Sequence, residues 1–167
     1  LDTDRLSLAV LGLLKRDEVK KRDLDMIGNR EVSEKKRREL WAYYEARREE
    51  LTQPIRDIVE KIALANHQDG VGFRRKNLPA LLGKYFLDML DAMRAQGSML
   101  AAGAPAFYIV GNNSTQLDGK RMEIETDQLL WGLAEKAGYE QVTFIGMELL
   151  KSRDIFRENR GTSESIL

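Results

Sequence analysis

Apolar residues recur at helical spacing in the first half of the chain. Ser33 is a residue type that often caps a helix, and the apolar face that follows it consists of Leu40, Tyr43, Tyr44 and Leu51. Pro54 suits the first turn of a second helix, whose apolar stripe consists of Ile55, Ile58, Val59 and Ile62. Together the two segments predict a helical hairpin over residues 33–66.

The second half alternates between helical and extended patterns. A long helical pattern from Leu78 to Gln96 precedes the apolar run from Ala106 to Val110, which breaks into a Gly-Asn-Asn-Ser turn at 111–114. A second helix, Thr126 to Ala137, and a second strand, Gln141 to Leu149, follow. Apolar runs alternating with helices predict an α/β fold with a mostly parallel sheet. Ligands of such sheets bind beyond the carboxyl ends of the strands, so the turn is the first candidate site.

The flanking segments complete the predicted organisation. Residues 1–14 read as an amphipathic helix, and residues 15–32 as a charged connection. The glycine-rich, polar stretch from 66 to 77 predicts a loop and an internal boundary. With the start of the hairpin at residue 33, the predicted units are 1–32, 33–66 and 67–167. The chain begins without an initiator Met and ends in residues that resemble the start of a strand. We therefore expect it to be a piece of a longer protein.

Composition limits the chemistry. Lys and Arg total 27, as do Asp and Glu, so the net charge is zero and a nucleic-acid site would have to be a local basic patch. The absence of cysteine excludes disulfides, thiolate metal sites and a cysteine nucleophile within the chain, and suits a reducing cytoplasm. His67 is the only histidine, which excludes a histidine metal cluster. Neither a signal peptide nor a long apolar run is present, so we expect a soluble, cytoplasmic protein.

Short segments in a fixed order carry a family resemblance. The first matches are to three parts of one enzyme family: the segment after its catalytic loop (residues 1–12 and 27–28), the helix that crosses its sheet (residues 85–89), and the next strand with its turn (residues 107–113). The later matches are Ile124-Glu125-Thr126 at a helix start, Gly138-Tyr139 before an outer strand, and Glu164 to Leu167 at the start of a closing antiparallel strand. In this order they resemble the amino-methylating DNA methyltransferases.

The resemblance covers nearly the whole chain apart from the hairpin, but two motifs of the family are missing. The family binds S-adenosylmethionine on a Gly-rich loop and transfers the methyl group at a (Ser/Asp/Asn)-Pro-Pro-Tyr loop, and neither motif occurs here. The resemblance therefore implies the C-terminal half of such an enzyme, with a partial class I methyltransferase (Rossmann-like) sheet and an inserted helical hairpin. The whole enzyme would methylate an exocyclic amino group of adenine or cytosine in DNA, while this half would be inactive alone, with no catalytic residue and no cofactor of its own.

Candidate pocket residues lie at the end of the first apolar strand. Asn112, Asn113 and Ser114 could line the pocket for the target base or for the cofactor, because amide groups both donate and accept at a base edge. The alternative is an Asx turn, in which these side chains satisfy only the local backbone.

Candidate DNA contacts are basic residues, together with one aromatic neighbour. Phe73, Arg74, Arg75 and Lys76 stand together before the long helix, where three cations could bind phosphates, or could be a solvated run. The other candidates for DNA contact are Arg5, Arg30, Lys120 and Arg121. Arg5 and Arg30 could instead pair with nearby aspartates.

Other features have a structural alternative of their own. The charges of the hairpin are typical of a solvated, ion-paired face, but the hairpin could also recognise DNA or bind a partner through Trp41, Tyr43 and Tyr44. Trp131 is interpreted as core, and the pair Asp88 and Asp91 as an exposed helical face rather than an acid/base pair.

The functional alternatives belong to different classes. One is a non-catalytic α/β interaction module that dimerises or binds a partner through the hairpin, and another is an intact small α/β enzyme. For a half domain, we expect DNA as a partner and an open sheet edge at 107–110 that either self-associates or binds the missing N-terminal half.

Overall fold

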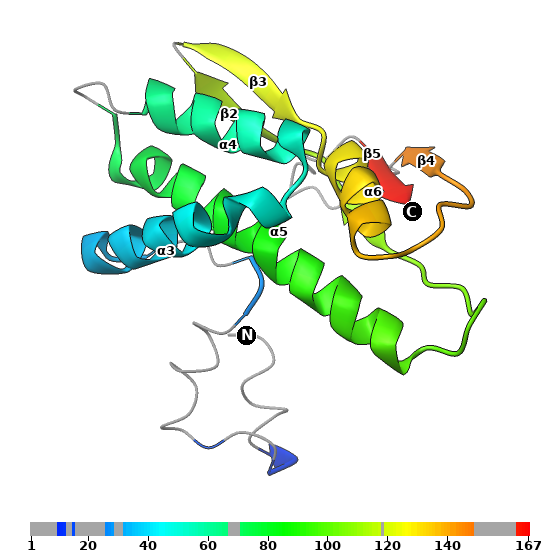
Figure 1. Ribbon diagram of the computed structural model, residues 1–167. Coiled ribbons are helices and arrows are strands. Elements are labelled where there is room, and N and C mark those ends of the chain that lie inside the picture. The colour runs from blue at the N-terminus through cyan, green and yellow to red at the C-terminus, as the bar shows by residue number, and fades with distance from the viewer. Residues whose placement is uncertain are drawn as a thin grey trace.

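The long helix α5 (Phe73–Met99) runs through the middle of the molecule, and the other elements lie around it (Figure 1). This computed structural model describes residues 10–12, 15, 26–28, 32–66, 71–117, 119–148 and 163–167. The other described elements, in chain order, are α3 (Glu34–Arg47), η1 (Arg48–Glu50), α4 (Gln53–Ala65), β1 (Ile109–Gly111), β2 (Asn113–Leu117), β3 (Lys120–Ile124), α6 (Thr126–Lys136), β4 (Ile145–Glu148) and β5 (Ser163–Ile166). A mixed α/β fold is thus confirmed. The predicted helix at 1–14 lies largely outside the described residues.

The predicted helical hairpin is present as α3, the short 3-10 helix η1 and α4. Ser33 caps α3 by accepting a hydrogen bond from the backbone amide of Lys36 (3.2 Å), and Pro54 lies in the first turn of α4. Both helices pack against α5. Their apolar stripe is therefore buried inside this chain.

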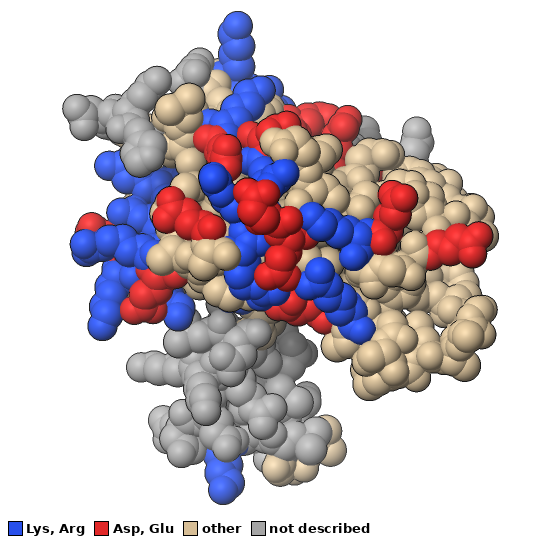
Figure 2. Space-filling view, in the orientation of Figure 1, with Lys and Arg blue, Asp and Glu red and all other residues tan. Residues whose placement is uncertain are grey.

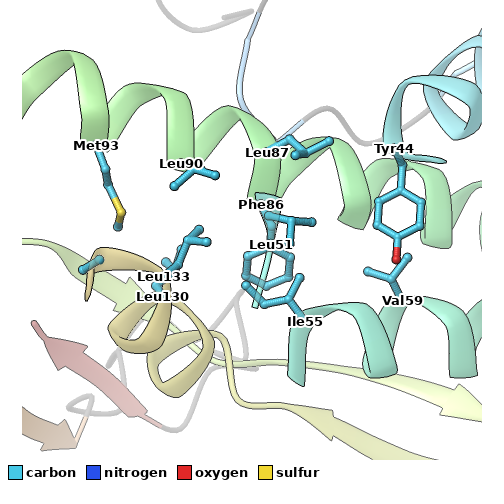
Figure 3. Close-up of a cluster of buried hydrophobic side chains, with 11 residues drawn as sticks. Tyr44, Leu51, Ile55, Val59, Phe86, Leu87, Leu90, Met93, Leu130 and Leu133 are labelled. Carbon is cyan, nitrogen blue, oxygen red and sulfur yellow. The ribbon is translucent and has the colours of Figure 1, made fainter. Parts of the chain in front are cut away.

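The main core forms where α5 meets α4, α6 and the end of α3. Figure 3 shows side chains from these helices pointing toward one another, with Phe86 of α5 beside Leu51 and Ile55. The fully buried members of this cluster are Tyr44, Leu51, Ile55, Val59, Phe86, Leu87, Leu90, Met93, Leu130 and Leu133. Complete burial of a side chain of this size contributes roughly 1.5–3 kcal/mol, so this cluster is the main source of the fold's stability.

A proline inside α5 fixes how α4 meets it. Pro79 has no N–H to donate to the carbonyl of Arg75 one turn earlier, which leaves that carbonyl without its helical partner. The side-chain amide of Asn66, at the end of α4, donates to this carbonyl instead (2.6 Å). The end of α4 is thereby held against the start of α5.

The three-stranded sheet has the order β1-β5-β4, and both pairings are antiparallel. The prediction of a mostly parallel sheet is therefore wrong for the described strands that pair with one another. The physical reason is that β5, from the end of the chain, lies between β1 and β4 and runs opposite to both. As a result, β1 and β4 are parallel to each other without being neighbours, and α6 lies in the connection between them.

The predicted Gly-Asn-Asn-Ser turn at 111–114 is wrong. The chain passes from β1 through Asn112 directly into β2, which pairs with β3 as an antiparallel hairpin. Lys120 and Arg121, expected in a loop, lie on β3. Asp118-Gly119 is a two-residue hairpin signal in the sequence, and Gly119 has the positive φ (77°) that such turns require. The sequence interpretation overlooked this signal because the flanking segments are polar.

Several element boundaries also differ from the predictions. The loop predicted up to residue 77 ends earlier, because α5 already begins at Phe73, and the strand predicted at 141–149 is the shorter β4. The helix after Thr126 ends close to where it was expected, and Gly138 follows it with a left-handed φ of 95°, as a glycine after a helix end does.

Tyr44 of α3 is completely buried because α5 carries a glycine, Gly83, where it meets α3. A Cβ placed on Gly83 would lie only 2.7 and 2.9 Å from the Cδ2 and Cγ atoms of the Tyr44 ring. These distances are shorter than van der Waals contact, so Gly83 permits the close approach of α3 to α5.

We predict that Gly83→Ala destabilises the protein despite the higher helix propensity of alanine. Overpacking a core costs about 1–3 kcal/mol, and a buried ring on the opposing helix places this site near the upper end. Alanine in a helix regains about 1 kcal/mol, so we expect a net loss of about 2 kcal/mol in urea unfolding. The matched control is Gly132→Ala in α6, where a Cβ would meet no atom within 4 Å. The control should be neutral or stabilising, and equal effects of the two changes would contradict this packing argument.

Arg47, at the end of α3, binds carboxylates from two elements. Its guanidinium donates to Asp91 of α5 (2.7 and 2.8 Å) and to Glu50 of η1 (2.7 and 3.0 Å). The hydrogen bonds from Arg47 lower the pKa of Asp91, and those from Arg47 and Arg94 lower the pKa of Glu50 to about 2. This network ties η1 and α3 to α5.

The two carboxylates should make stability depend on pH. A carboxyl group whose pKa is lower in the folded state stabilises the fold above its unfolded pKa, and this contribution is lost as the pH falls toward the folded pKa. We predict that Arg47→Ala lowers the free energy of unfolding at about pH 7, and that its difference from the parent protein shrinks between about pH 4.5 and pH 2. Urea unfolding across this range measures the effect, with Arg121→Ala as the exposed control. A difference that does not change with pH would assign the effect of Arg47 to packing.

Candidate nucleic-acid interface

The basic residues predicted to contact DNA lie at the start of α5. Arg74, Arg75 and Lys76 occupy its first turn, directly after Phe73, and the turn contains no acidic residue. Phe73 is itself about half exposed (52%). A helix N-terminus carries partial positive charge and orphan N–H groups, so three cations there disfavour the helix and favour an anion.

The fold brings a second predicted segment to the same place. Arg75 Nη2 donates to Gln116 Oε1 on β2 (3.2 Å), and Gln116 lies directly across the hairpin from Arg121 on β3. Residues paired in this way have their side chains on the same face, so Arg121 lies beside the start of α5. Lys120, its neighbour in the chain, points to the opposite face of the hairpin. The structure thus joins Arg75 and Arg121 but not Lys120.

A cavity of about 450 Å³ adjoins the start of α5, between α3 and the end of α4. Its lining residues are Arg37, Arg38, Trp41, Ala42, Glu45, Ala63, Asn66, Lys76, Pro79 and Ala80. Figure 2 shows Lys and Arg gathered on the side where α3 and α5 begin, while the side of α6 and the three-stranded sheet shows few charges. We call the residues Arg37, Arg38, Arg75, Lys76 and Arg121 the basic surface.

The predicted pocket residues Asn112, Asn113 and Ser114 lie away from the lining of this cavity. The Oδ1 atom of Asn112 accepts a hydrogen bond from the backbone amide of Asp127 (3.1 Å) and so satisfies the N-terminus of α6. Asn113 and Ser114 are exposed on β2, and none of the three lines the 450 Å³ cavity. For Asn112 the structure supports a capping role, although its position at the carboxyl end of β1 is as expected.

The acidic and aromatic residues that had a structural alternative have structural contacts. Asp91 binds Arg47, and Asp88 forms an ion pair with Lys84 on the same helix. Trp131 is half-buried, with its ring at 5.7 Å and a T-shaped angle to Phe144. Within the described part of the chain, no group of three or more His, Asp or Glu side chains could hold a metal ion. Arg5, Arg30 and His67 lie outside the described residues.

The sequence predicts functional roles for two of the cavity residues, Lys76 as a DNA contact and Trp41 as a partner contact, but not the cavity itself. Arg37 and Arg38 belong to the hairpin charges, for which an ion-paired face and a DNA-recognition surface were the alternatives, and their contacts with Glu34 (3.8 and 3.5 Å) agree with the ion-paired face. Asn66 was assigned to a loop boundary. Only the packing of α3 and α4 against α5 brings these residues next to Lys76.

No protein family, curated protein or solved structure matches the chain significantly. In the described residues, no helix is long and apolar enough to cross a membrane.

We predict that Arg75 and Arg121 act together on a DNA backbone. Each phosphate contact that is lost should reduce the slope of log affinity against log salt by about 0.9, so the double change to Ala should flatten the slope by up to about 1.8. Fluorescence anisotropy with a short labelled duplex, titrated at several salt concentrations, measures the slope. The control removes two exposed charges of the same sign, Lys35→Ala and Lys61→Ala, on α3 and α4. Equal slopes for the two double variants would mean that the basic surface is only a solvated face.

Proposed function

We propose that this chain is the C-terminal half of an S-adenosylmethionine-dependent DNA methyltransferase that modifies an exocyclic amino group of adenine or cytosine. The half supplies DNA contacts and one side of the sheet, and it is inactive alone. The cofactor loop and the Pro-Pro-Tyr loop of such an enzyme are supplied by the other half.

The observation that carries this proposal is the strand β5 and its two neighbours. The family resemblance implies an outer strand after Gly138-Tyr139 and a closing antiparallel strand from Glu164. In the structure β4 follows Gly138, and β5 pairs antiparallel with β4 and with β1. Two strands that are parallel to each other, connected through a helix and separated by an antiparallel strand from the chain end, agree with that implied order.

An open edge on β1 also supports the proposal. Backbone bonds between Tyr108 and Leu167 (2.9 and 3.2 Å) extend the pairing of β1 with β5. The alternation of antiparallel bonds then directs the backbone N–H and C=O of Ile109 away from β5. Within the described residues β1 has a neighbour on this one side only. Unpaired strand edges favour pairing with another strand.

One face of the same sheet is uncovered as well. Tyr108 and Val110 pack against the main core, so Ile109 between them points to the opposite face, where it is 66% exposed. Ile166 pairs with both Ile109 and Ile145, and Ile145 is 49% exposed. By this register Ile109 and Ile145 lie on the same face, and exposed branched apolar residues on one face of a sheet are typical of a layer that another element covers. The missing half of an α/β domain would provide that layer.

The alternative of an interaction module that dimerises through its hairpin has less support. Leu51, Ile55 and Val59 of the hairpin are completely buried in the chain's own core. The hairpin therefore has little apolar surface left for a partner helix.

The experiment that tests this function adds back the missing half. We predict that the chain alone does not bind S-adenosylmethionine in calorimetry at tens of micromolar protein. Mixed with an upstream polypeptide that carries a Gly-rich loop and a Pro-Pro-Tyr loop, it should form a complex that methylates an amino group in DNA. Stoichiometric cofactor binding by the chain alone would contradict the half-domain proposal.

The same complex tests the sheet edge. Ile109→Lys places a charge on the uncovered face and should weaken the complex at least about tenfold, since truncations and charges at the centre of an interface have the largest effects. Leu64→Lys, at an equally exposed apolar residue of α4, is the control and should bind normally. Sedimentation of the mixture measures both. A complex that tolerates Ile109→Lys would mean that the halves meet elsewhere.

A further inference from the structure

The cavity between α3, α4 and α5 combines an aromatic wall with small apolar residues. Trp41 lines it, and the other apolar lining residues are Ala42, Ala63, Pro79 and Ala80. The volume of about 450 Å³ is within the range of small-molecule sites, which is roughly 300–1,000 Å³. The small alanine side chains leave space in the cavity that larger side chains would fill.

Trp41 is held in a fixed orientation. Its Nε1 donates to Glu45 Oε1 one helical turn later (2.8 Å), and its ring lies 5.1 Å from that of the buried Tyr44. Glu45 also lines the cavity, where one of its carboxylate oxygens accepts from the indole and its negative charge is outnumbered by the cations of the lining. A rigid indole loses little conformational freedom when a planar ring stacks on it.

Three cations surround the aromatic wall. Arg37 and Arg38 share the exposed Glu34 at 3.8 and 3.5 Å; Arg38 is exposed and Arg37 is half-buried, and contacts of this length to a surface carboxylate are weak. Lys76 forms no ion pair with any described residue of the chain. The arginines can therefore exchange a surface carboxylate for a phosphate at little cost, and Lys76 can bind one directly.

Asn66, another lining residue, is fixed by a contact with the backbone. It donates its side-chain amide to the carbonyl of Arg75, which joins the end of α4 to the start of α5 at the cavity. Arg75 in turn contacts Gln116 of β2, next to Arg121. The cavity is thus continuous with the rest of the basic surface.

We propose that this cavity binds a single unpaired nucleotide, with the base stacked on Trp41 and the phosphate held by Arg37, Arg38 and Lys76. Stacking on an aromatic residue requires a base that is outside a duplex, and flanking cations bind its backbone. Because the cavity adjoins the rest of the basic surface, we favour a nucleotide that is part of a strand, so that a neighbouring phosphate can reach Arg75. Binding of a nucleotide within a strand rests on the proposed DNA contacts, whereas binding of a single free nucleotide does not.

Tryptophan fluorescence of the 167-residue chain tests the site directly. The chain has two tryptophans, so Trp131→Phe leaves Trp41 as the only reporter, and Trp41→Phe leaves Trp131 as a matched control far from the cavity. The ligands are deoxyadenosine monophosphate, a short single-stranded oligonucleotide and a blunt duplex. We expect the oligonucleotide to quench the Trp131→Phe protein and not the Trp41→Phe protein, and the duplex to quench neither.

Affinity measurements test the residues. By anisotropy with the labelled oligonucleotide, Trp41→Leu should weaken binding ~5- to 100-fold, the range expected for loss of one stacked base. Arg38→Ala and Lys76→Ala should weaken binding several-fold. Lys35→Ala, on the same helix as Arg38 but outside the cavity lining, should not. Circular dichroism checks that each variant is folded. If Trp41→Leu does not fold, the fluorescence of Trp41 in the Trp131→Phe protein is the decisive measurement.

The outcomes separate the possibilities. Quenching by the oligonucleotide and by the mononucleotide supports a site for free nucleotides and strands alike, and quenching by the oligonucleotide alone supports a site for a nucleotide within a strand. No quenching of Trp41, equal quenching of Trp131, or equal loss with Lys35→Ala would overturn the site. If duplex binding and restoration of methylation persist while Trp41 does not respond, only this inference fails and the proposed function stands.

Discussion

The burial of α5 against α3, α4 and α6 is the interaction on which the rest of the structure depends. Phe86, Leu87 and Leu90 supply its buried face, whereas most positions of β1, β2 and β3 are exposed. Two backbone details set the approach of its neighbours. Gly83 lets the ring of Tyr44 lie against the helix, and Pro79 leaves a carbonyl that Asn66 satisfies. These contacts position the start of α5 and, with it, the basic surface.

Charges in this protein fall into two physical groups. Around Arg47 the carboxylates have lowered pKa values because short hydrogen bonds join three elements, which is what a structural network does. Arg37 and Arg38 instead have long contacts to a single exposed glutamate. An ordered ion network stabilises the fold, whereas loosely paired cations beside an aromatic wall leave their charge available to a ligand.

The three-stranded sheet is covered on one face and open on the other. Helices supply the cover for Tyr108 and Val110, while Ile109 and Ile145 remain on the outer face. An open edge and exposed apolar residues on the same strand are features that favour contact with a further element, and we propose that this element is a layer of the same domain. This links the geometry of β1 to the resemblance with half of a methyltransferase.

The sequence alone determined the helices, because periodic apolar residues, the cap at Ser33 and the glycine at 138 act over one or two turns. It also contained the hairpin signal at Gly119, but the flanking segments are mostly polar and lack the apolar runs that predict strands. Tertiary structure decided the rest. The pairing of β5 with β1 joins residues more than 50 positions apart, and no local pattern records that β5 lies between β1 and β4. The same holds for the site, since Arg37, Trp41 and Lys76 meet only where α3 and α5 pack, and side-chain packing at a distance is invisible to periodicity.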